Sequence, residues 1–454
     1  MNYRYTLLFI TVFTAIFFIR CKTHEPTPPG EETESSWEVI QQQIFEPRCV
    51  SCHAAGTTYS LESDLVLTAD EGYEQLVDRV PHNEAAQKDG LLLVGKKGLE
   101  SLYTSFLWEK INAKEQEHFY NDHTEYGDMM PLGSPFLTNG ELAFIREWIL
   151  AGAPSEGEVV SLDLLKDTTR QPLSDLSFTA LTPPASGFQL HLGPFDVIPN
   201  YEREFFYYNP LNNSQDVFVR QVEVSMRPGT HHFILYDFPS GAAKPTPNTY
   251  RDLRDPWGGY ILPTVISIQD QVFFYGTQWR LTNYTFPEGV ALRLKAGHGL
   301  DMNSHYVNRS NDTATGEIYV NVHTVPLNEV THVAENIFLN NDNFELPPNQ
   351  VTTIKKTYTF NERRHIFLLF SHAHQHMTEF RIFGVGGSVD GKLLYYTNDW
   401  EHPPMLEMDP PLVLEAGQGL RAEATYNNTE NKTLRFGLLS QDEMMIVFGA
   451  YYTD

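Results

Sequence analysis

Two histidines separated by a single residue, His372 and His374, directly follow a run of bulky apolar residues at positions 366–370. Side chains of a β-strand alternate between its two faces, so these imidazoles are expected to project side by side from one face. Paired imidazoles are typical transition-metal ligands. Further along, Met444 precedes another apolar run, at positions 446–452, and offers a thioether. The sequence therefore predicts a metal site made of two imidazoles and a thioether.

A second set of histidines lies upstream, and it comprises the adjacent pair His231 and His232 and the single His305. Adjacent residues of a regular strand face opposite ways, so the pair can share a metal only if the strand is irregular or different ring nitrogens are used. The dipeptide Pro228-Gly229 just before the pair favours a local bulge or twist. This set predicts a second site, built from imidazoles alone.

A third group, Cys49, Cys52 and His53, has the spacing of a c-type haem attachment motif. Thiols three residues apart reach the two vinyl groups of one porphyrin, and the next residue can ligate the iron as a histidine. A zinc or redox dithiol is the alternative interpretation. The adjoining histidine and the lack of a second CxxC motif favour haem.

The second axial ligand of such a haem is expected later in the same domain. The segment 127–133 is rich in turn residues and contains two adjacent methionines, of which we predict Met130 as the ligand. Met129 and His123 remain open as alternatives, as does a core role for either methionine.

Length and composition limit the function classes. A chain of 454 residues suggests three domains of ordinary size, and 41% hydrophobic with 13% aromatic residues excludes a disordered protein. The 58 acidic residues against 32 basic ones argue against nucleic acid or an anionic membrane surface as a partner. All three cysteines fall within the first 52 residues, so no disulfide framework is expected.

The first 20 residues are typical of an export signal, since their apolar stretch at 6–19 is too short for a comfortable membrane span. Cys21 follows directly, which resembles a bacterial lipoprotein signal with Cys21 as the lipidated residue. Arg20 departs from the small residue favoured there, and an uncleaved anchor is the alternative. Both interpretations put the bulk of the chain outside the cytoplasm, behind a polar linker at 22–36.

Residues 37–154 are predicted to form an all-α, cytochrome c-like haem domain. Helical apolar spacing at 37–45 predicts its first helix, and the capping-box spacing Thr138–Glu141 predicts the start of its last helix, at 142–149. Residues 155–182 are polar and weakly patterned, so they are predicted to be a second linker.

Everything beyond is predicted to be β-structure. Alternating apolar and polar residues indicate strands at 217–224, 290–294, 317–322 and 420–426. This pattern favours two antiparallel, jelly-roll-like β-sandwiches. A proline-bearing break at 344–349 puts their boundary near residue 338, giving sandwiches at 183–337 and 338–454.

Together, these two sandwiches resemble the copper type II, ascorbate-dependent monooxygenases, the family of the peptidylglycine-hydroxylating and dopamine β-hydroxylating enzymes. The resemblance rests on five pieces in the order of the family: His231-His232 after a Pro/Gly turn, the segment 286–290, His305-Tyr306, His372-Ala373-His374, and Asp442-Glu443-Met444 before an aromatic-rich terminal strand.

The resemblance implies two copper ions beside the one covalent haem c. The storage copper would be held by His231, His232 and His305, and the catalytic, oxygen-activating copper by His372, His374 and Met444. Sulfur ligands select Cu(I), the state that binds dioxygen. Met445 and His376-Met377 are alternatives, because a register slip of one residue changes which side chain faces the metal.

This chain departs from the family in two respects, and the second bears on the substrate. The animal enzymes carry many disulfides, whereas these sandwiches have no cysteine. Peptide-amidating members hold the substrate carboxylate with an Arg, an Asn and a Tyr, and the matching positions here are Phe370, Ile446 and Phe448. These apolar replacements argue against peptide amidation and indicate a small, uncharged substrate.

We therefore expect an exported copper-dependent monooxygenase that inserts one oxygen atom of O2 into a C–H bond, with the haem passing electrons to the storage copper. An ascorbate-like reductant or a redox protein would be the electron donor, and the chain would be a periplasm-facing or cell-surface lipoprotein of a Gram-negative bacterium. The alternatives are a non-catalytic haem and copper electron carrier or copper-binding surface protein and, more remotely, an adhesive module. The remaining histidines with no partner at ligand spacing are predicted to be structural: His191, His298, His323, His332, His365 and His402.

Overall fold

The computed structural model describes residues 34–174, 176–438 and 441–454. The predicted export signal, the lipidation residue Cys21 and most of the predicted 22–36 linker lie outside the described residues. Within the described ranges, no helix combines the length and the apolar character needed to pass through a bilayer.

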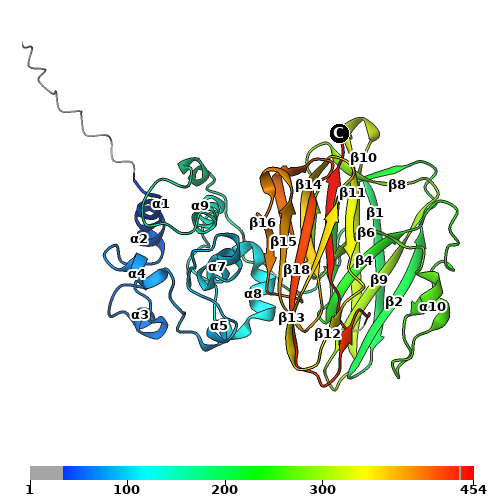
Figure 1. The fold of residues 1–454 in the computed structure, drawn as a ribbon, viewed down its shortest axis with the longest axis horizontal. Coiled ribbons are helices and arrows are strands. Elements are labelled where there is room, and N and C mark those ends of the chain that lie inside the picture. Colours follow the sequence, from blue (N-terminus) through cyan, green and yellow to red (C-terminus); the bar gives the residue numbers. More distant parts are fainter. Residues whose placement is uncertain (1–33, 175, 439–440) are drawn as a thin grey trace, which may run out of the picture.

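The N-terminal part of the described chain is a small helical region, drawn in blue to teal in Figure 1. Its elements are α1 (Ser36–Val39), η1 (Ile40–Phe45), α2 (Glu46–Arg48), α3 (Thr58–Ser63), α4 (Gly72–Leu76), α5 (Glu84–Lys88), α6 (Leu99–Tyr103), α7 (Phe106–Ile111), η2 (Ala113–Glu115), α8 (Gln116–Asp122), η3 (Thr124–Tyr126), α9 (Asn139–Leu150) and η4 (Leu162–Lys166).

Helix α9 begins at the predicted capping box, three residues before the predicted range 142–149. The Thr138 side chain accepts a hydrogen bond from the Glu141 amide, and the Glu141 carboxylate accepts one from the Thr138 amide at 2.6 Å, which completes a capping box. The first and last of these helices pack together, because the rings of Trp37 and Trp148 lie 5.5 Å apart in the buried core.

The predicted linker at 155–182 differs from the structure over most of its length. Ser36 Oγ accepts hydrogen bonds from the amides of Val159 and Val160, and Val160 is buried in the helical core. Gln116 of α8 bonds the backbone of Pro172 and Ser174. Few apolar residues make these contacts. The polar composition of 155–182 therefore did not indicate that most of this segment packs against the helical region.

The remainder of the described chain is mostly β-sheet, as predicted. Its elements are β1 (Gly187–Val197), β2 (Tyr201–Pro210), β3 (Val217–Met226), β4 (Thr230–Asp237), β5 (Tyr250–Asp252), α10 (Leu262–Ser267), β6 (Val272–Thr277), β7 (Leu281–Thr285), β8 (Val290–Leu294), β9 (Gly299–Asn308), β10 (Ala314–Val325), η5 (Leu327–Glu329), β11 (His332–Asn340), β12 (Glu345–Leu346), β13 (Gln350–Thr359), β14 (Arg364–His372), β15 (Met377–Val385), η6 (Gly387–Val389), β16 (Leu393–Thr397), β17 (Leu406–Leu414), β18 (Gly419–Asn428), β19 (Leu434–Arg435) and β20 (Ile446–Tyr452). The strands predicted at 217–224, 290–294, 317–322 and 420–426 correspond to β3, β8, β10 and β18.

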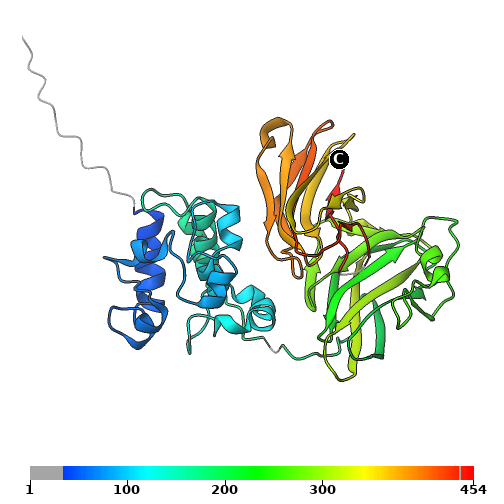
Figure 2. The ribbon, with the colours of Figure 1, turned by 60° about the horizontal axis from the view of Figure 1, so that its bottom comes forward.

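One long sheet runs through the whole β part. In the described residues it has the order β1-β10-β3-β8-β11-β20-β14-β17, with β7 attached to β3. A smaller sheet, β5-β2-β9-β4-β6, packs in the first half, and another, β13-β18-β15-β16, packs in the second half (Figure 2). Side chains from all three sheets share one hydrophobic core, so the architecture is sandwich-like in both halves.

The predicted boundary near residue 338 falls inside a strand. Strand β11 pairs in parallel with β8 of the first half and antiparallel with β20 of the second half. A strand that hydrogen-bonds on both sides satisfies its backbone groups from two halves at once, so the two halves are joined through a continuous sheet. The proline-bearing break at 344–349 follows this strand and does not divide the halves.

The helical region contacts the β part through α6, which packs against β16, and through α8, which Figure 1 shows beside the sheets. Glu117 of α8 forms an ion pair with Arg280 at 2.6 Å and accepts a hydrogen bond from the Leu281 amide at 3.0 Å. Glu100 of α6 pairs with Arg381 of β15 at 3.2 Å. These contacts place α8 next to the segment that leads into β7.

Candidate functional site

The adjacent histidines His231 and His232 stand on an irregular part of β4. Thr230 pairs with Tyr306 of β9 and His232 with His305, so one residue is gained on β4 and the register shifts at His231. Gly229 just before it has φ of +89°, a conformation that favours glycine. This bulge confirms the irregularity predicted from Pro228-Gly229, and it lets both adjacent rings face one site.

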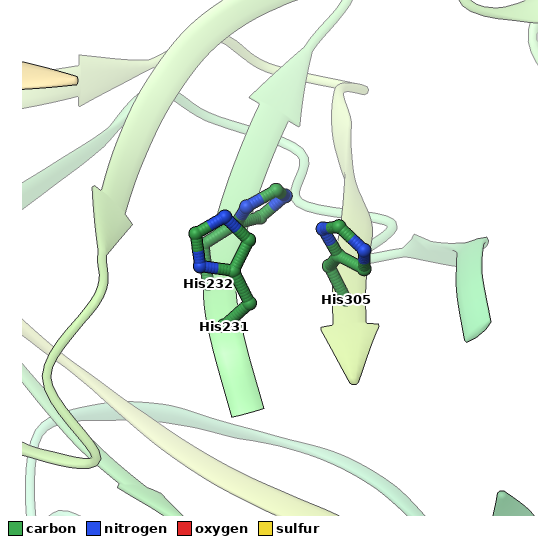
Figure 3. Close-up of side chains that lie close together, drawn as sticks. All are labelled: His231, His232 and His305. Carbon is green, nitrogen blue, oxygen red and sulfur yellow. The ribbon is translucent and has the colours of Figure 1, made fainter. Parts of the chain in front are cut away.

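These two residues and His305 form a compact group, which Figure 3 shows. The ring centroids of His231 and His232 lie 5.2 Å apart, those of His231 and His305 5.1 Å, and those of His232 and His305 4.9 Å. One ligand nitrogen from each residue lies within 4.8 Å of the others. The structure therefore brings together the ligand set that was predicted from imidazoles alone.

Groups behind two of the rings fix which nitrogen faces the site. His232 Nε2 lies 3.0 Å from the Asn303 amide oxygen, and His305 Nε2 lies 2.6 Å from a Glu202 carboxylate oxygen. Nδ1 of His232 and both ring nitrogens of His231 and of His305 are buried and have no hydrogen-bond partner among the described residues. Buried unpaired polar atoms are costly, and a metal ion would satisfy these nitrogens, so the set fits a metal.

The other predicted set is His372, His374 and Met444. Its two histidines lie at the end of β14 and in the loop after it. His372 Nδ1 lies 2.9 Å from Gln278 Oε1, and His374 Nδ1 lies 3.3 Å from the carbonyl oxygen of Asp442. With Nδ1 engaged in both rings, Nε2 is the nitrogen that would bind a metal. The buried Glu443 carboxylate accepts hydrogen bonds from the amides of His374 at 3.1 Å and His376 at 2.8 Å, which holds the loop in shape.

The choice between the methionines is supported by their surroundings. Met444 lines the same pocket as His372 and His374. Met445 is almost fully buried elsewhere, and its sulfur accepts a hydrogen bond from Asn341 Nδ2 at 3.4 Å. Met377 is a core residue of β15. The register of β20 therefore favours Met444 over both alternatives.

The two sets adjoin in this structure. His231 lies 5.9 Å from His372 and 6.1 Å from His374 between ring centroids, and its ligand nitrogen lies within 4.8 Å of theirs. We call His231, His232, His305, His372 and His374 the five-histidine cluster. We had expected two separate sites, one in each sandwich, but here His231 belongs to both sets. The sheet shared by the two halves accounts for this proximity.

The cluster is electrically suited to metal binding. Burial and the neighbouring histidines hold the pKa of His231, His232 and His372 well below the usual 6.5. Neutral imidazoles keep their lone pairs, so little proton competition would oppose a metal at neutral pH.

An apolar pocket of about 180 Å³ opens beside this cluster. Phe370, Ile446 and Phe448, the three positions that are polar in the peptide-amidating enzymes, all line it. The other apolar lining residues come from both halves: Ile234, Phe273, Phe338, Pro403, Met405, Phe436 and Leu438. Phe370, Ile446 and Phe448 therefore offer no charged group to a substrate carboxylate.

The predicted haem ligands lie in the helical region. His53 Nδ1 lies 3.2 Å from the Leu65 carbonyl oxygen, which leaves Nε2 for iron. Cys49 and Cys52 form no disulfide in the described chain, and burial raises the pKa of the Cys49 thiol to about 12. A redox dithiol needs a lowered thiol pKa, so this environment disfavours that alternative.

The environment of the two adjacent methionines separates them. Met130 packs against the same apolar cluster as Cys49, whereas Met129 is buried in a different one with Phe119 and Tyr126. His123, the other alternative, lies with its Nε2 3.1 Å from His118 Nε2. These contacts favour Met130 as the axial residue.

The histidines predicted to be structural have the expected partners. The ion pairs are His191–Glu317, His298–Asp237, His323–Glu223 and His365–Asp454, and His332 stacks on Tyr452. His402 also pairs with a carboxylate, but its partner, Asp122 at 2.8 Å, belongs to the helical region and not to the β part. No ligand-like spacing marks the orienting groups Asn303, Glu202 and Gln278, so their role could not be predicted from the sequence.

Comparisons with known proteins add no family. No family model matches the sequence, and no curated protein matches it. Among solved structures, the chain is similar to the STIV MCP, with 9% identity and a TM-score of 0.28 over 58% of this chain and 96% of that chain. It is also similar to PBCV-1 VP54 fitted into a reconstruction of the virophage Sputnik, with 6% identity and a TM-score of 0.22 over 61% and 96% of the two chains. The PBSX exported protein XepA gives 12% identity and a TM-score of 0.16 over 54% and 89%. Similarities this weak carry no argument about function.

Proposed function

We propose that this chain is a copper-dependent monooxygenase that hydroxylates a C–H bond of a small, uncharged substrate with O2, and that its helical region is a c-type haem domain that donates electrons. The observation that carries the proposal is the five-histidine cluster, with Met444, on the wall of an apolar pocket. When bound, the copper ions would supply the electron transfer and oxygen activation, and the haem would supply electrons.

The chain's own residues prepare the two ligand sets differently. His231, His232 and His305 offer nitrogen alone, which suits a copper that changes oxidation state without changing ligands. His372, His374 and Met444 add a thioether, which favours Cu(I). Asn303 and Gln278 fix ring tautomers from behind, and such outer-shell partners typically contribute 10–100-fold in metal affinity.

The pocket supports a substrate about the size of one aromatic ring. An apolar cavity of roughly 150 Å³ accommodates benzene, and this pocket measures about 180 Å³. Aromatic and aliphatic walls exclude water from the reacting C–H bond and orient an apolar molecule by shape. Glu204 borders the pocket, but it is paired with Arg254 at 3.2 Å, so it is engaged within the protein.

Contacts between the two parts support the helical region as the electron donor. The Met130 amide donates a 2.6 Å hydrogen bond to the Lys110 carbonyl oxygen of α7, and only the short helix η2 separates α7 from α8. A cavity of about 380 Å³ lies between His118 and Asp122 on the α8 side and His231 on the β side. The helical region, which we propose as the donor, therefore packs close to His231, whereas the sequence suggested a flexible tether.

The pocket also favours an enzyme over an electron carrier. A carrier needs metal ligands and an exposed edge, but it has no use for an apolar cavity beside its softer ligand set. The rival hypothesis of a non-catalytic copper protein predicts metal binding without a hydroxylated product.

A copper count together with an oxygen-labelling assay tests the proposal. Protein loaded with copper and supplied with a reductant and ¹⁸O2 should bind two coppers and transfer one labelled oxygen atom to small aromatic hydrocarbons. His305→Ala should lower the copper content by one equivalent. His231→Ala should weaken both sites, because His231 borders both sets.

His191→Ala is the matched control, since His191 pairs with Glu317 on β10 away from the cluster. It should leave copper content and product unchanged. Copper binding without labelled product from any apolar substrate would favour the electron carrier. Equal copper loss in His191→Ala and His305→Ala would refute the assigned ligands.

A further inference from the structure

A second group of histidines and carboxylates lies where the helical region meets the β part, apart from the five-histidine cluster. Glu109 belongs to α7, His118 to α8, and His123 follows α8 directly. One ligand atom from each of these residues lies within 4.8 Å of the others. Asp399 and His402 of the loop between β16 and β17 approach the group from the β part.

The ring nitrogens of this group face each other as two ligands of one ion would. His118 Nδ1 lies 2.9 Å from the Asp122 carboxylate, which turns Nε2 towards His123. The two Nε2 atoms are 3.1 Å apart. Two nitrogens bound tetrahedrally to zinc at about 2.0–2.1 Å lie about 3.4 Å from each other. Only a small outward adjustment separates the observed spacing from that of a bound ion.

The surroundings hold both rings in place. Asp122 bonds His118 and also lies 2.8 Å from His402 Nδ1, which gives the carboxylate–histidine arrangement found behind zinc ligands. The His123 ring stacks on Tyr126 with a centroid distance of 4.3 Å and an interplanar angle of 8°. These contacts restrict each ring before any ion binds.

The carboxylates around the group also bear on cation binding. The Glu109 carboxylate has no hydrogen bond or ion pair with any residue that the structure describes, and it lies within ligand distance of His118 and His123. The carboxylates Glu115 and Asp399 lie near the same His118 ring. Despite burial, the hydrogen bond to Asp122 and these carboxylates raise the pKa of His118 to about 10, so a divalent ion must displace a proton from this ring.

We propose that His118, His123 and Glu109 bind one zinc-class divalent ion beside the loop that carries Asp399 and His402. Two imidazoles and a carboxylate without sulfur suit zinc, whereas magnesium and calcium prefer oxygen ligands alone and Cu(I) prefers sulfur. His118 also borders a cavity, from which water can complete the coordination. This site is independent of the proposed monooxygenase function.

Zinc content of the full-length chain after chelator treatment, zinc loading and exhaustive dialysis tests the proposal. His123→Ala and Glu109→Gln should each bind one zinc equivalent fewer than the parent. His82→Ala, which removes an exposed histidine of the same region, should bind as much zinc as the parent. Circular dichroism confirms that each variant is folded.

Two further variants make the result specific. Repeating the count in a His305→Ala background should show the same loss of one equivalent, because the five-histidine cluster is a separate binder. Asp122→Asn is predicted to weaken zinc binding by about 10–100-fold while one equivalent still binds at saturation, since Asp122 only positions His118. An unchanged zinc content in folded His123→Ala and Glu109→Gln would overturn the proposal and leave a network of ion pairs between the two parts.

Discussion

Polar groups lie behind three imidazoles of the candidate copper site, whereas the ring nitrogens of His231 have no hydrogen-bond partner among the described residues. Asn303 faces His232 Nε2, Glu202 faces His305 Nε2, and Gln278 faces His372 Nδ1. The first two rings would bind through Nδ1 and the third through Nε2. The nitrogen used by each ligand thus depends on residues that the ligand spacing alone does not reveal.

Met444 and Met445 provide a test between adjacent thioethers. Met444→Ala is expected to weaken Cu(I) binding by at least about tenfold, equivalent to about 1.4 kcal/mol, because it removes the soft ligand. Turnover should stop, while most of the copper bound as Cu(II) remains on the imidazoles. Competition with a coloured Cu(I) chelator measures the affinity.

Met445→Ala is the control for that substitution. Met445 is buried in the core, so its removal is expected to lower the free energy of unfolding by about 2–5 kcal/mol without a comparable change in Cu(I) affinity. If Met445→Ala weakens Cu(I) binding and Met444→Ala does not, the register assigned to the ligand is wrong.

Met130 and Met129 give a parallel test in the helical region. Because Met130 shares the apolar cluster of Cys49, Met130→Ala should abolish the far-red sulfur-to-iron absorption of the oxidised haem protein. Met129→Ala should keep this band and mainly lose packing around Phe119. Absorption spectra of the two purified variants decide between them, and loss of the band in Met129→Ala alone would exchange their roles.

At the scale of single elements, local sequence patterns predicted the features that depend on interactions between neighbouring residues. The alternation at 217–224 and the capping box of Thr138 and Glu141 depend on neighbours within a few residues, and both are found in the structure. The bulge at His231 was also signalled locally, by Pro228-Gly229.

Long-range partners could not be predicted in this way. Gln278 and His372 are 94 residues apart in sequence, and the group around His118 is completed by Asp399 and His402 from the far half of the chain. The packed state of residues 155–174 was missed for the same reason, because it depends on where Ser36 and Gln116 lie. The spacing of residues within one segment does not show which distant residues they contact in the folded chain.

The bulge that positions His231 gives a prediction at this scale. Gly229→Ala puts a Cβ on a residue with φ of +89°, and such a conformation costs an L-residue about 1–2 kcal/mol. The new Cβ would meet only ordinary contacts, the nearest being Val307 O at 3.5 Å, so the strain is in the backbone. We expect the strand to relax, His231 to shift and copper binding to weaken. Denaturant titration and a copper count measure both effects.

Gly241→Ala is matched to this variant. Gly241 has φ of +88° and no atom within 4 Å of an added Cβ, and it lies in the loop after β4. The same backbone strain should lower the free energy of unfolding by a similar amount while copper binding stays intact. Equal copper loss in both variants would show that general destabilisation, and not the bulge, is responsible.

At the scale of the whole molecule, the long sheet and the docked helical region bring distant parts to one place. Strand β11 joins the two halves, so His231 of the first half lies within 5.9 Å of His372 of the second between ring centroids. Helix α8 then closes one side of the cavity that His231 borders. The candidate site therefore depends on all three parts of the chain.

The docking of the helical region rests in part on the Glu117–Arg280 ion pair, whose side chains are 13% and 11% exposed. Burial raises the pKa of Glu117 despite the neighbouring Arg280, so the pair is expensive to desolvate. Removing one partner leaves a buried charge alone, which costs about 3–5 kcal/mol. Glu117→Ala is therefore expected to release the helical region from the β part, and small-angle X-ray scattering should record a larger radius of gyration.

Two controls separate undocking from a general effect of charge. Glu117→Leu combined with Arg280→Met removes both charges and should largely restore docking, because apolar replacement of a buried pair is often neutral or stabilising. Glu345→Ala breaks an ion pair with Arg435 whose side chains are each 63% exposed, and it should leave the radius unchanged. If electrons enter through the helical region, the undocked variant should also turn over more slowly, and the double variant should recover. An unchanged radius in Glu117→Ala, or a double variant as undocked as the single one, would mean that other contacts hold the two parts together.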